Sequence, residues 1–193
     1  MKGSHVEEFE GLSASEVMTL EAYADTIIPG ERRGPGDRAV AGAASGGGAV
    51  ASGAVDLMTS PQGGLAGTLD SLVEGLNAHA GDYATRTGLD ADPAVPPFVA
   101  LEFADRIALA RELLAPGHPE QELWVALAMF CAMAWDTGAH MHTTDAMASG
   151  HPGLTAMGFM PPEPDGAWRF RRFSYGRPLA ALHPRTTPTG DPQ

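Results

Sequence analysis

The segment from Leu12 to Gly30 reads LSASEVMTLEAYADTIIPG, and its pattern indicates a helical fold. Ser13 and Glu16 have the spacing of a capping box, in which each side chain accepts a hydrogen bond from the other residue's backbone N–H. Apolar residues then recur at the spacing of one helix face, at Val17, Leu20, Ala24, Ile27 and Ile28. The pattern predicts an amphipathic helix that begins after Ser13.

The same segment also predicts where this helix ends. Pro29 has no N–H to continue the helical hydrogen bonds, and its ring pushes Ile28 out of the α region. Gly30 can adopt whatever turn follows. We therefore expect a well-terminated helix that packs into the core.

The size and charge of the chain set limits on its function. At 193 residues it is most simply one domain, with residues 1–11 and 186–193 expected to be flexible tails. The net charge is −12, from 24 acidic and 12 basic residues, which makes the chain a poor candidate for binding nucleic acid. The segment from Trp168 onward is basic instead, with five arginines against one acid. We expect it to dock onto the acidic body or onto a partner.

Nothing in the sequence points to export or to a membrane. Cys131 is the single cysteine, so no intramolecular disulfide can form, and its apolar surroundings predict an inert thiol. The N-terminal residues are acidic and no apolar run follows them, unlike a signal peptide. No stretch reaches the roughly 18 apolar residues that a membrane span needs. These features favour a cytoplasmic protein.

Further helices are predicted along the middle of the chain. Residues 37–58 are rich in alanine and glycine, which fits two short helices or a loop. One apolar stripe runs from Leu65 to Tyr83 and another from Val99 to Leu114, with Pro97 well placed as a first helical residue. Glu102 and Arg106 have the spacing of an exposed ion pair on the second of these helices.

The most apolar stretch lies near residue 130. Every position from Leu123 to Trp135 is apolar, and the stretch is too short to cross a bilayer. This predicts a central helix of a packed bundle, over about Glu120–Ala139. Strand-like alternation is almost absent, so we expect an all-α, irregular bundle of five to seven helices around this central one. From Ala148 onward, frequent prolines predict a non-helical C-terminal strap.

One polar cluster could carry chemistry. Asp136, His140, His142, Asp145 and His151 place three imidazoles and two carboxylates within sixteen residues, and such side chains bind zinc, iron or copper. We take Asp136, His140 and His142 as candidate catalytic residues, and His140, His142 and Asp145 as candidate metal ligands. The alternative is structural, with Asp136 orienting or capping His140 and the other side chains hydrogen-bonded at a helix end.

The stretch from Thr19 to Gly30, TLEAYADTIIPG, resembles the N-terminal motif of the gluconate 2-dehydrogenase subunit 3 family. In that family a helix of the form T-L-x-A-x-A-D-x-I-I-P leads into a turn rich in glycine and proline. The later segments Gly153–Pro161 and Tyr175-Gly176 are also loosely similar to later segments of that family. The resemblance carries over Asp25 and Pro29 as motif positions with structural roles, Asp25 for a hydrogen bond near the helix end, and it transfers no catalytic residue.

The resemblance implies a small, helical, non-catalytic subunit beside a flavoprotein of the glucose-methanol-choline type. FAD would belong to that partner, and no cofactor is expected in this chain. Many family members carry a twin-arginine export signal, whereas Arg32-Arg33 here follows the first helix, which favours a cytoplasmic variant. Two alternatives stay open, namely a stand-alone small enzyme that uses the histidine cluster, with or without a metal, and a self-associating structural protein.

Overall fold

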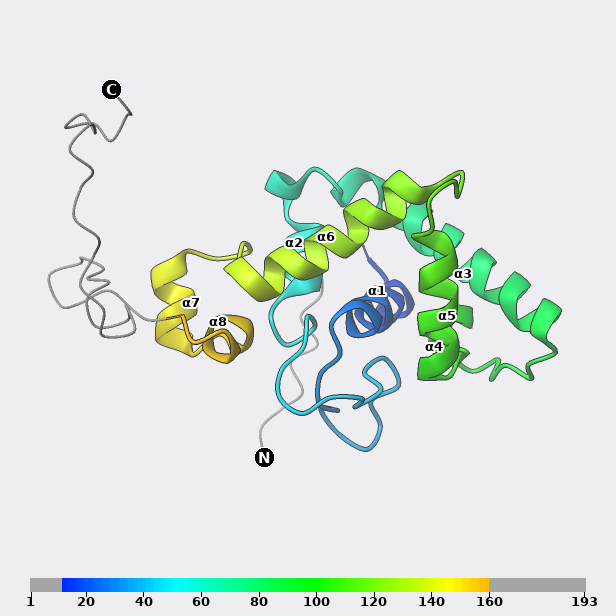
Figure 1. The fold of residues 1–193 in the computed structure, drawn as a ribbon, viewed down its shortest axis with the longest axis horizontal. Coiled ribbons are helices and arrows are strands. Elements are labelled where there is room, and N and C mark those ends of the chain that lie inside the picture. The colour runs from blue at the N-terminus through cyan, green and yellow to red at the C-terminus, as the bar shows by residue number, and fades with distance from the viewer. Residues whose placement is uncertain (1–11, 160–193) are drawn as a thin grey trace, which may run out of the picture. The chain divides into compact units, whose positions relative to one another are not determined.

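The computed structural model describes residues 12–159, and every regular element in that range is a helix (Figure 1). The α-helices are α1 Ala14–Ile27, α2 Ala54–Thr59, α3 Leu69–Thr87, α4 Pro97–Ala100, α5 Phe103–Leu113, α6 Gln121–Thr137, α7 Thr143–Ser149 and α8 Pro152–Ala156. Two 3₁₀ turns, Pro61–Gly63 and Ala66–Thr68, precede α3. The predicted all-α class is confirmed. Residues 12–159 contain eight α-helices, namely α6 and seven others, which agrees in number with the five to seven helices expected beside the central one.

Helix α1 forms as the sequence predicts. The Ser13 N–H donates to the Glu16 carboxylate at 2.6 Å, and the Glu16 N–H donates to the Ser13 hydroxyl at 3.3 Å, which completes the capping box. At the other end, Ile28 before Pro29 is extended, with φ −133° and ψ 96°. Both ends of this helix are therefore fixed by local sequence.

Helix α1 is also the element around which the others pack. It contacts each of α2, α3, α4, α5 and α6, and it lies among them in Figure 1. Leu20, Ala22, Tyr23 and Ala24 are fully buried. The Tyr23 hydroxyl donates to the Trp124 carbonyl at 2.9 Å, which ties α1 to α6. The core of the described residues is thus centred on α1.

The apolar helix near residue 130 differs from its prediction. It is present as α6, but Leu123, Met129 and Met133 are 53%, 55% and 39% exposed. Its buried side is formed by Trp124, Leu127, Cys131 and Ala134. The expectation of burial on all sides is wrong for the described residues, because α1, α2 and α8 pack against one side of α6.

Of the two apolar stripes predicted before α6, the first forms one helix and the second is divided into two. Helix α3 buries the predicted residues from Leu69 to Tyr83 on one face. The next stripe begins at Pro97 as predicted, but Leu101 and Glu102 are extended and divide it into α4 and α5. This break turns Arg106 inward, so the predicted exposed pair with Glu102 does not exist. Arg106 is only 4% exposed.

The alanine- and glycine-rich segment is a closely packed loop up to Gly53, followed by the single helix α2. Its backbone pairs with the end of α1, since the Ala49 N–H donates to the Ile28 carbonyl at 3.0 Å and the Glu31 N–H donates to the Gly46 carbonyl at 2.8 Å. A Cβ on Gly48 would lie 2.4 Å from the Ile28 carbonyl oxygen. Glycine is required there because two backbone segments touch.

Asp25 binds the backbone of this loop at two points through its carboxylate. Its side chain is 1% exposed, and its two oxygens accept from the Gly30 N–H at 3.0 Å and the Ala41 N–H at 2.8 Å. A buried carboxylate needs such donors, since leaving it unpaired would cost several kcal/mol. Asp25 therefore joins the end of α1 to the loop backbone at Gly30 and at Ala41.

Arg106 joins the same loop to the segment between α4 and α5, since two of its four backbone partners lie in the loop and two lie in or just after α4. Its guanidinium donates to four backbone carbonyls, those of Leu101, Ala39, Arg38 and Val99, at distances from 2.6 to 3.1 Å. Burial lowers the pKa of Arg106, and the nearby charge of Asp25 is the largest opposing effect. The two buried charges thus stabilise each other across the loop.

The chain after residue 148 contains a helix that was not predicted. Pro152 is the first residue of α8, a position that proline tolerates. The expectation of non-helical chain from Ala148 onward is therefore wrong for Pro152–Ala156. The rest of the strap, and the expected tails at residues 1–11 and 186–193, lie outside the described residues. None of the helices in residues 12–159 is both long and apolar enough to cross a membrane.

We predict that Asp25→Asn destabilises the protein by about 3 kcal/mol, because the amide can accept one of the two N–H groups only and Arg106 loses its buried counter-charge. Urea unfolding followed by circular dichroism measures this change. Asp92→Asn is the matched control, since the Asp92 side chain is 42% exposed and forms only a surface ion pair with Arg38 and a hydrogen bond from the Ala94 N–H. Equal effects of the two substitutions would contradict the role of Asp25.

We predict that Gly48→Ala destabilises the protein by about 2 kcal/mol, because the new methyl group would collide with the Ile28 carbonyl and the backbone of Pro29 and Gly30. Thermal unfolding measures the effect. Gly34→Ala is its control in the same loop, since no atom lies within 4 Å of the added Cβ, and it should change stability by less than about 1 kcal/mol. A neutral Gly48→Ala variant would show that the two segments can separate freely.

Candidate functional site

The predicted polar cluster begins where α6 ends. Gly138 has a φ of +61° and terminates the helix after Thr137, so His140 lies in the connection to α7. Asp136 is exposed in the last turn of α6. The two residues therefore do not share a helical face, although their spacing predicted that they would.

His140 and His151 come together. Their ring centroids are 5.8 Å apart, and His151 is only 4% exposed. His151 is the N-cap of α8, where its Nδ1 accepts from the Leu154 N–H at 3.3 Å. Its Nε2 lies 3.2 Å from the Ser52 carbonyl oxygen, so we assign the ring proton to Nε2 as the donor. His151 thereby joins α8 to the loop before α2.

The His140 ring lies against the backbone of Gly53. A Cβ at that glycine would be 2.5 Å from both Cε1 and Nε2 of the ring, and Gly53 has a φ of +79°. The His140 Nδ1 and the Ser52 hydroxyl are both buried and have no hydrogen-bond partner within residues 12–159. Two unsatisfied polar atoms in one region are unusual, and such groups often mark functional positions.

The surroundings of His140 favour its neutral form. Burial lowers its pKa, and the neighbouring His151 acts in the same direction, while Asp56 on α2 opposes the shift. A neutral imidazole can accept or donate a proton at one nitrogen while it donates or accepts at the other. The pair His140 and His151 could therefore support acid–base chemistry.

The other predicted residues lie apart from this pair. His142 is exposed and is the N-cap of α7, where its Nδ1 accepts from the Thr144 N–H at 3.3 Å. Asp145 is exposed in the first turn of α7. Across the described range, no three His, Cys, Asp or Glu side chains gather as a metal-binding group. The predicted metal ligands do not fit a metal centre in this arrangement.

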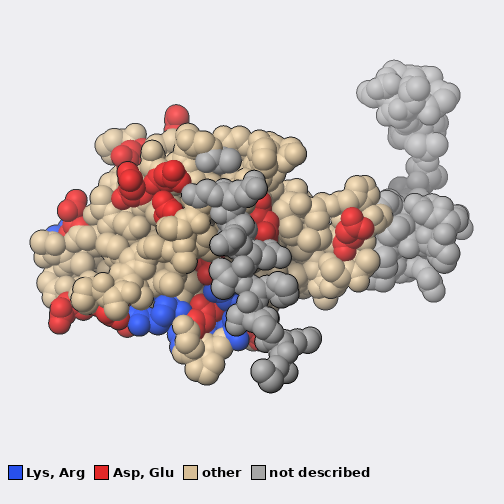
Figure 2. All heavy atoms as spheres, turned by 180° about the vertical axis from the view of Figure 1, so that it is seen from behind, with Lys and Arg blue, Asp and Glu red and all other residues tan. Residues whose placement is uncertain are grey.

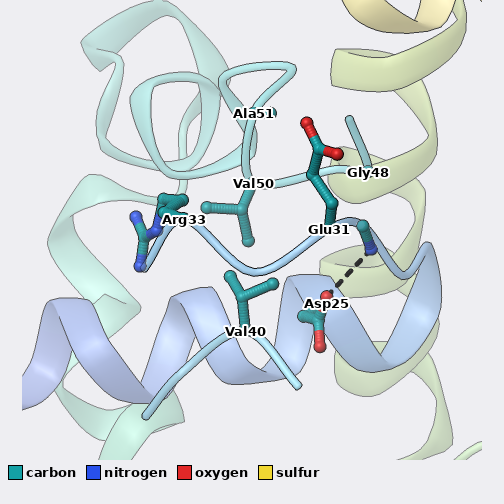
Figure 3. A pocket seen from close by; sticks show the side chains of 8 residues that line it. Asp25, Glu31, Arg33, Val40, Gly48, Val50 and Ala51 are labelled. Atoms are coloured by element: carbon teal, nitrogen blue, oxygen red, sulfur yellow. Dashed lines mark hydrogen bonds between the residues drawn. The ribbon is translucent and has the colours of Figure 1, made fainter. Parts of the chain in front are cut away.

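A small cavity lies above the end of α1 (Figure 3). Its volume of about 20 Å³ is room for a single water molecule. Val40 and Val50 face each other across it, and Asp25 lies at its base (Figure 3). Because both Asp25 oxygens are bound by backbone N–H groups, this carboxylate holds the loop together.

Sequence reasoning missed a second polar cluster at the start of α6. The His79 Nε2 on α3 lies 2.7 Å from a Glu120 carboxylate oxygen, to which the Trp124 Nε1 also donates at 3.2 Å. The hydrogen bond to His79 is the main cause of a lowered pKa at Glu120. His79 and Glu120 are 41 positions apart, so no local pattern could have found the pair. Its evident effect is to join α3 to α6.

Cys131 behaves as its surroundings predict. It is fully buried in α6, and burial raises the pKa of its thiol to about 12. The thiolate that a nucleophile or a metal ligand requires is therefore strongly disfavoured. This residue contributes to packing and is not part of the candidate site.

Exposed apolar side chains gather in the second half of the described residues. Six of the seven large ones lie between residues 123 and 159, namely Leu123, Met129, Met133, Met141, Met157 and Phe159. The exception is Leu89 at the end of α3. Most of the exposed large apolar side chains of residues 12–159 thus belong to α6 and the segments that follow it.

The charges of the same residues are strongly acidic. Residues 12–159 contain 18 acids and six arginines. Acidic side chains are spread over the face shown in Figure 2, whereas most of its basic atoms lie low on that face. No lysine or arginine occurs between residues 112 and 168, so the region from α6 to α8 has no basic side chain other than histidine.

The fold is that of an all-helical protein organised around its first helix. Comparison with known families places the chain in one of them, a family of unknown function, DUF5987, whose pattern matches residues 14–193. The match begins at the first residue of α1. Neither the curated proteins nor the solved structures that were compared include a match.

We predict that protein stability falls as the pH drops from about 7.5 to 5. The pKa of His140 is lowered in the fold, so the unfolded chain binds the proton more readily, near pH 6.5. The contribution of neutral His140 to the free energy of unfolding is therefore fully present above that pH and is lost as the pH falls below it. Urea unfolding at several pH values measures the slope.

His140→Gln should flatten this dependence, because the glutamine carries no proton to lose or gain. If His140→Gln retained the full slope, another group would be responsible for the acid sensitivity.

Proposed function

We propose that this protein is a non-catalytic accessory subunit of a flavin-dependent oxidoreductase of the glucose-methanol-choline type, and that it assists the folding, stability or activity of that enzyme. The proposal starts from the resemblance of residues 19–30 to the gluconate 2-dehydrogenase subunit 3 motif. FAD would be bound by the partner. The structural observation that supports it most strongly is that six of the seven exposed large apolar side chains lie on α6 or in the segments that follow it.

The role of the motif residues is compatible with this proposal. Asp25 binds the loop backbone and Pro29 ends α1, so the motif acts by building the fold. A motif of this kind is expected in a subunit that supplies a binding surface, since it holds a scaffold together without contributing a reactive group.

The exposed apolar side chains favour a binding surface. Four of the six from Leu123 to Phe159 are methionines, namely Met129, Met133, Met141 and Met157. Contiguous apolar surface on a protein commonly marks an interface, and the flexible methionine side chain adapts to irregular partners. An accessory subunit needs such a surface for its enzyme.

A stand-alone small enzyme is the second candidate. It is favoured by the buried, unpartnered Nδ1 of His140 beside His151 and the unpartnered hydroxyl of Ser52. In that case His140 would act as a general acid or base at a neutral pH. Because the predicted metal ligands lie apart, this candidate is considered as metal-free chemistry.

Co-expression tests the first candidate. The chain should be produced together with a glucose-methanol-choline flavoprotein from the same genome, and the complex analysed by size-exclusion chromatography with flavin absorbance. We expect the two proteins to elute together, and the yield of flavin-loaded enzyme to rise at least several-fold over expression alone. Separate elution, with a flavoprotein that is fully active by itself, would rule out the accessory role.

The same preparations separate the second candidate from the first. His140→Ala should leave the yield and activity of the flavoprotein unchanged if the chain is an accessory subunit. Elemental analysis of the purified chain should find metal at background level. A catalytic activity of the purified chain that is lost in His140→Ala would favour the enzyme instead.

A further inference from the structure

Helix α6 carries two separate stripes of side chains. The inner stripe is buried against the bundle and consists of Trp124, Leu127, Cys131 and Ala134. The second stripe, here called the outer seam, consists of Glu122, Ala126, Met129, Met133 and Asp136. Its members alternate at spacings of four and three residues, which is the spacing of side chains that pack against another helix.

Four of the five residues of the outer seam are exposed. Met129 and Met133 lie in its middle and are among the most exposed large apolar side chains of residues 12–159. Ala126 is half-buried, and Glu122 and Asp136 at the two ends are exposed. The seam thus has an apolar centre and an acid at each end.

The length of the seam fits one further helix. From Glu122 to Asp136 the helix rises by about 21 Å, at roughly 1.5 Å per residue. A partner helix of about four turns would cover this length. Small residues such as Ala126 allow close approach of the two helices, and the methionines would fill the space between them.

The charge of this region indicates which kind of helix fits. Glu122 and Asp136 border the apolar centre, and Asp145 is exposed on the next helix. Lysine and arginine are absent from residues 112–168, so no basic side chain of that stretch offsets these acids. A partner helix with basic residues beside an apolar stripe would be complementary to the seam.

A second copy of the chain fits less well. If two outer seams paired in antiparallel orientation, Glu122 of one copy would face Asp136 of the other. If they paired in parallel, each acid would face its own equivalent. Both arrangements bring like charges together at the ends of the seam, which opposes self-association.

We propose that the outer seam of α6 is the docking site for a basic amphipathic helix of a partner protein. The inference rests on the proposed accessory function for the identity of that partner, which would be the flavoprotein. The surface itself follows from the spacing, exposure and charge of the five seam residues. It can therefore be tested without the enzyme.

The probe is a synthetic, fluorescein-labelled 18-residue peptide of leucine and lysine, with the two residue types on opposite helix faces. Binding to the full-length protein is followed by fluorescence anisotropy, and a leucine–glutamate peptide of the same pattern serves as the charge control. We expect saturable binding of the lysine peptide and at least tenfold weaker binding of the glutamate peptide. Met129→Glu combined with Met133→Glu should weaken lysine-peptide binding at least tenfold.

Leu89→Glu is the matched control, because Leu89 is an exposed apolar residue at the end of α3, away from the seam. It should bind the peptide like the wild type. Glu122→Lys combined with Asp136→Lys keeps the apolar centre and should weaken binding several-fold, which separates charge from hydrophobic contact. Circular dichroism should show native helix content for each variant, as all substituted side chains are exposed.

Three results would overturn the inference: no binding of the lysine peptide, equal binding of both peptides, or unchanged binding by the Met129→Glu, Met133→Glu variant. A wild-type dimer in light scattering that this variant dissociates would assign the seam to a second copy instead. Peptide binding at the seam without co-elution of the flavoprotein would reject the accessory role alone. Co-elution that survives the double substitution would reject the seam alone.

Discussion

The buried carboxylate of Asp25 is the contact on which the rest of the described structure depends. It closes the end of α1 by binding the N–H groups of Gly30 and Ala41, and Arg106 binds the same loop through the carbonyls of Arg38 and Ala39. Because α1 touches each helix from α2 to α6, a loop fixed to its end also fixes where α2 begins. The arrangement of α2 and α6, and with it the position of His140 against Gly53, follows from this anchoring.

The sequence predicted what is local and missed what depends on distant contacts. Ser13, Glu16 and Pro29 define both ends of α1 within a few residues, so its bounds were predictable. The inward turn of Arg106 depends on carbonyls up to 68 positions away, and nothing in its own helix indicates it. The same holds for His140 and His151, since both rings pack against the distant backbone at Ser52 and Gly53.

Apolar composition alone could not show that α6 has one covered and one exposed side. All thirteen positions from Leu123 to Trp135 read as core, yet only the stripe through Trp124 faces the bundle. A helix that is apolar on both sides is typical of one that packs between two bodies, its own domain and another protein. The exposed apolar side of α6 therefore connects the accessory proposal with the docking site. The pair His140 and His151 lies beyond the end of that helix.

Methionine oxidation tests the central claim, that α6 binds a partner through its outer seam. Dilute hydrogen peroxide should oxidise Met129 and Met133 rapidly in the free protein, because both are exposed, and buried Met58 slowly. Mass spectrometry should show that the flavoprotein slows oxidation of Met129 and Met133 several-fold and leaves Met58 unchanged. The account would be contradicted if a flavoprotein that co-elutes with the chain left the oxidation rates of Met129 and Met133 the same as in the free protein.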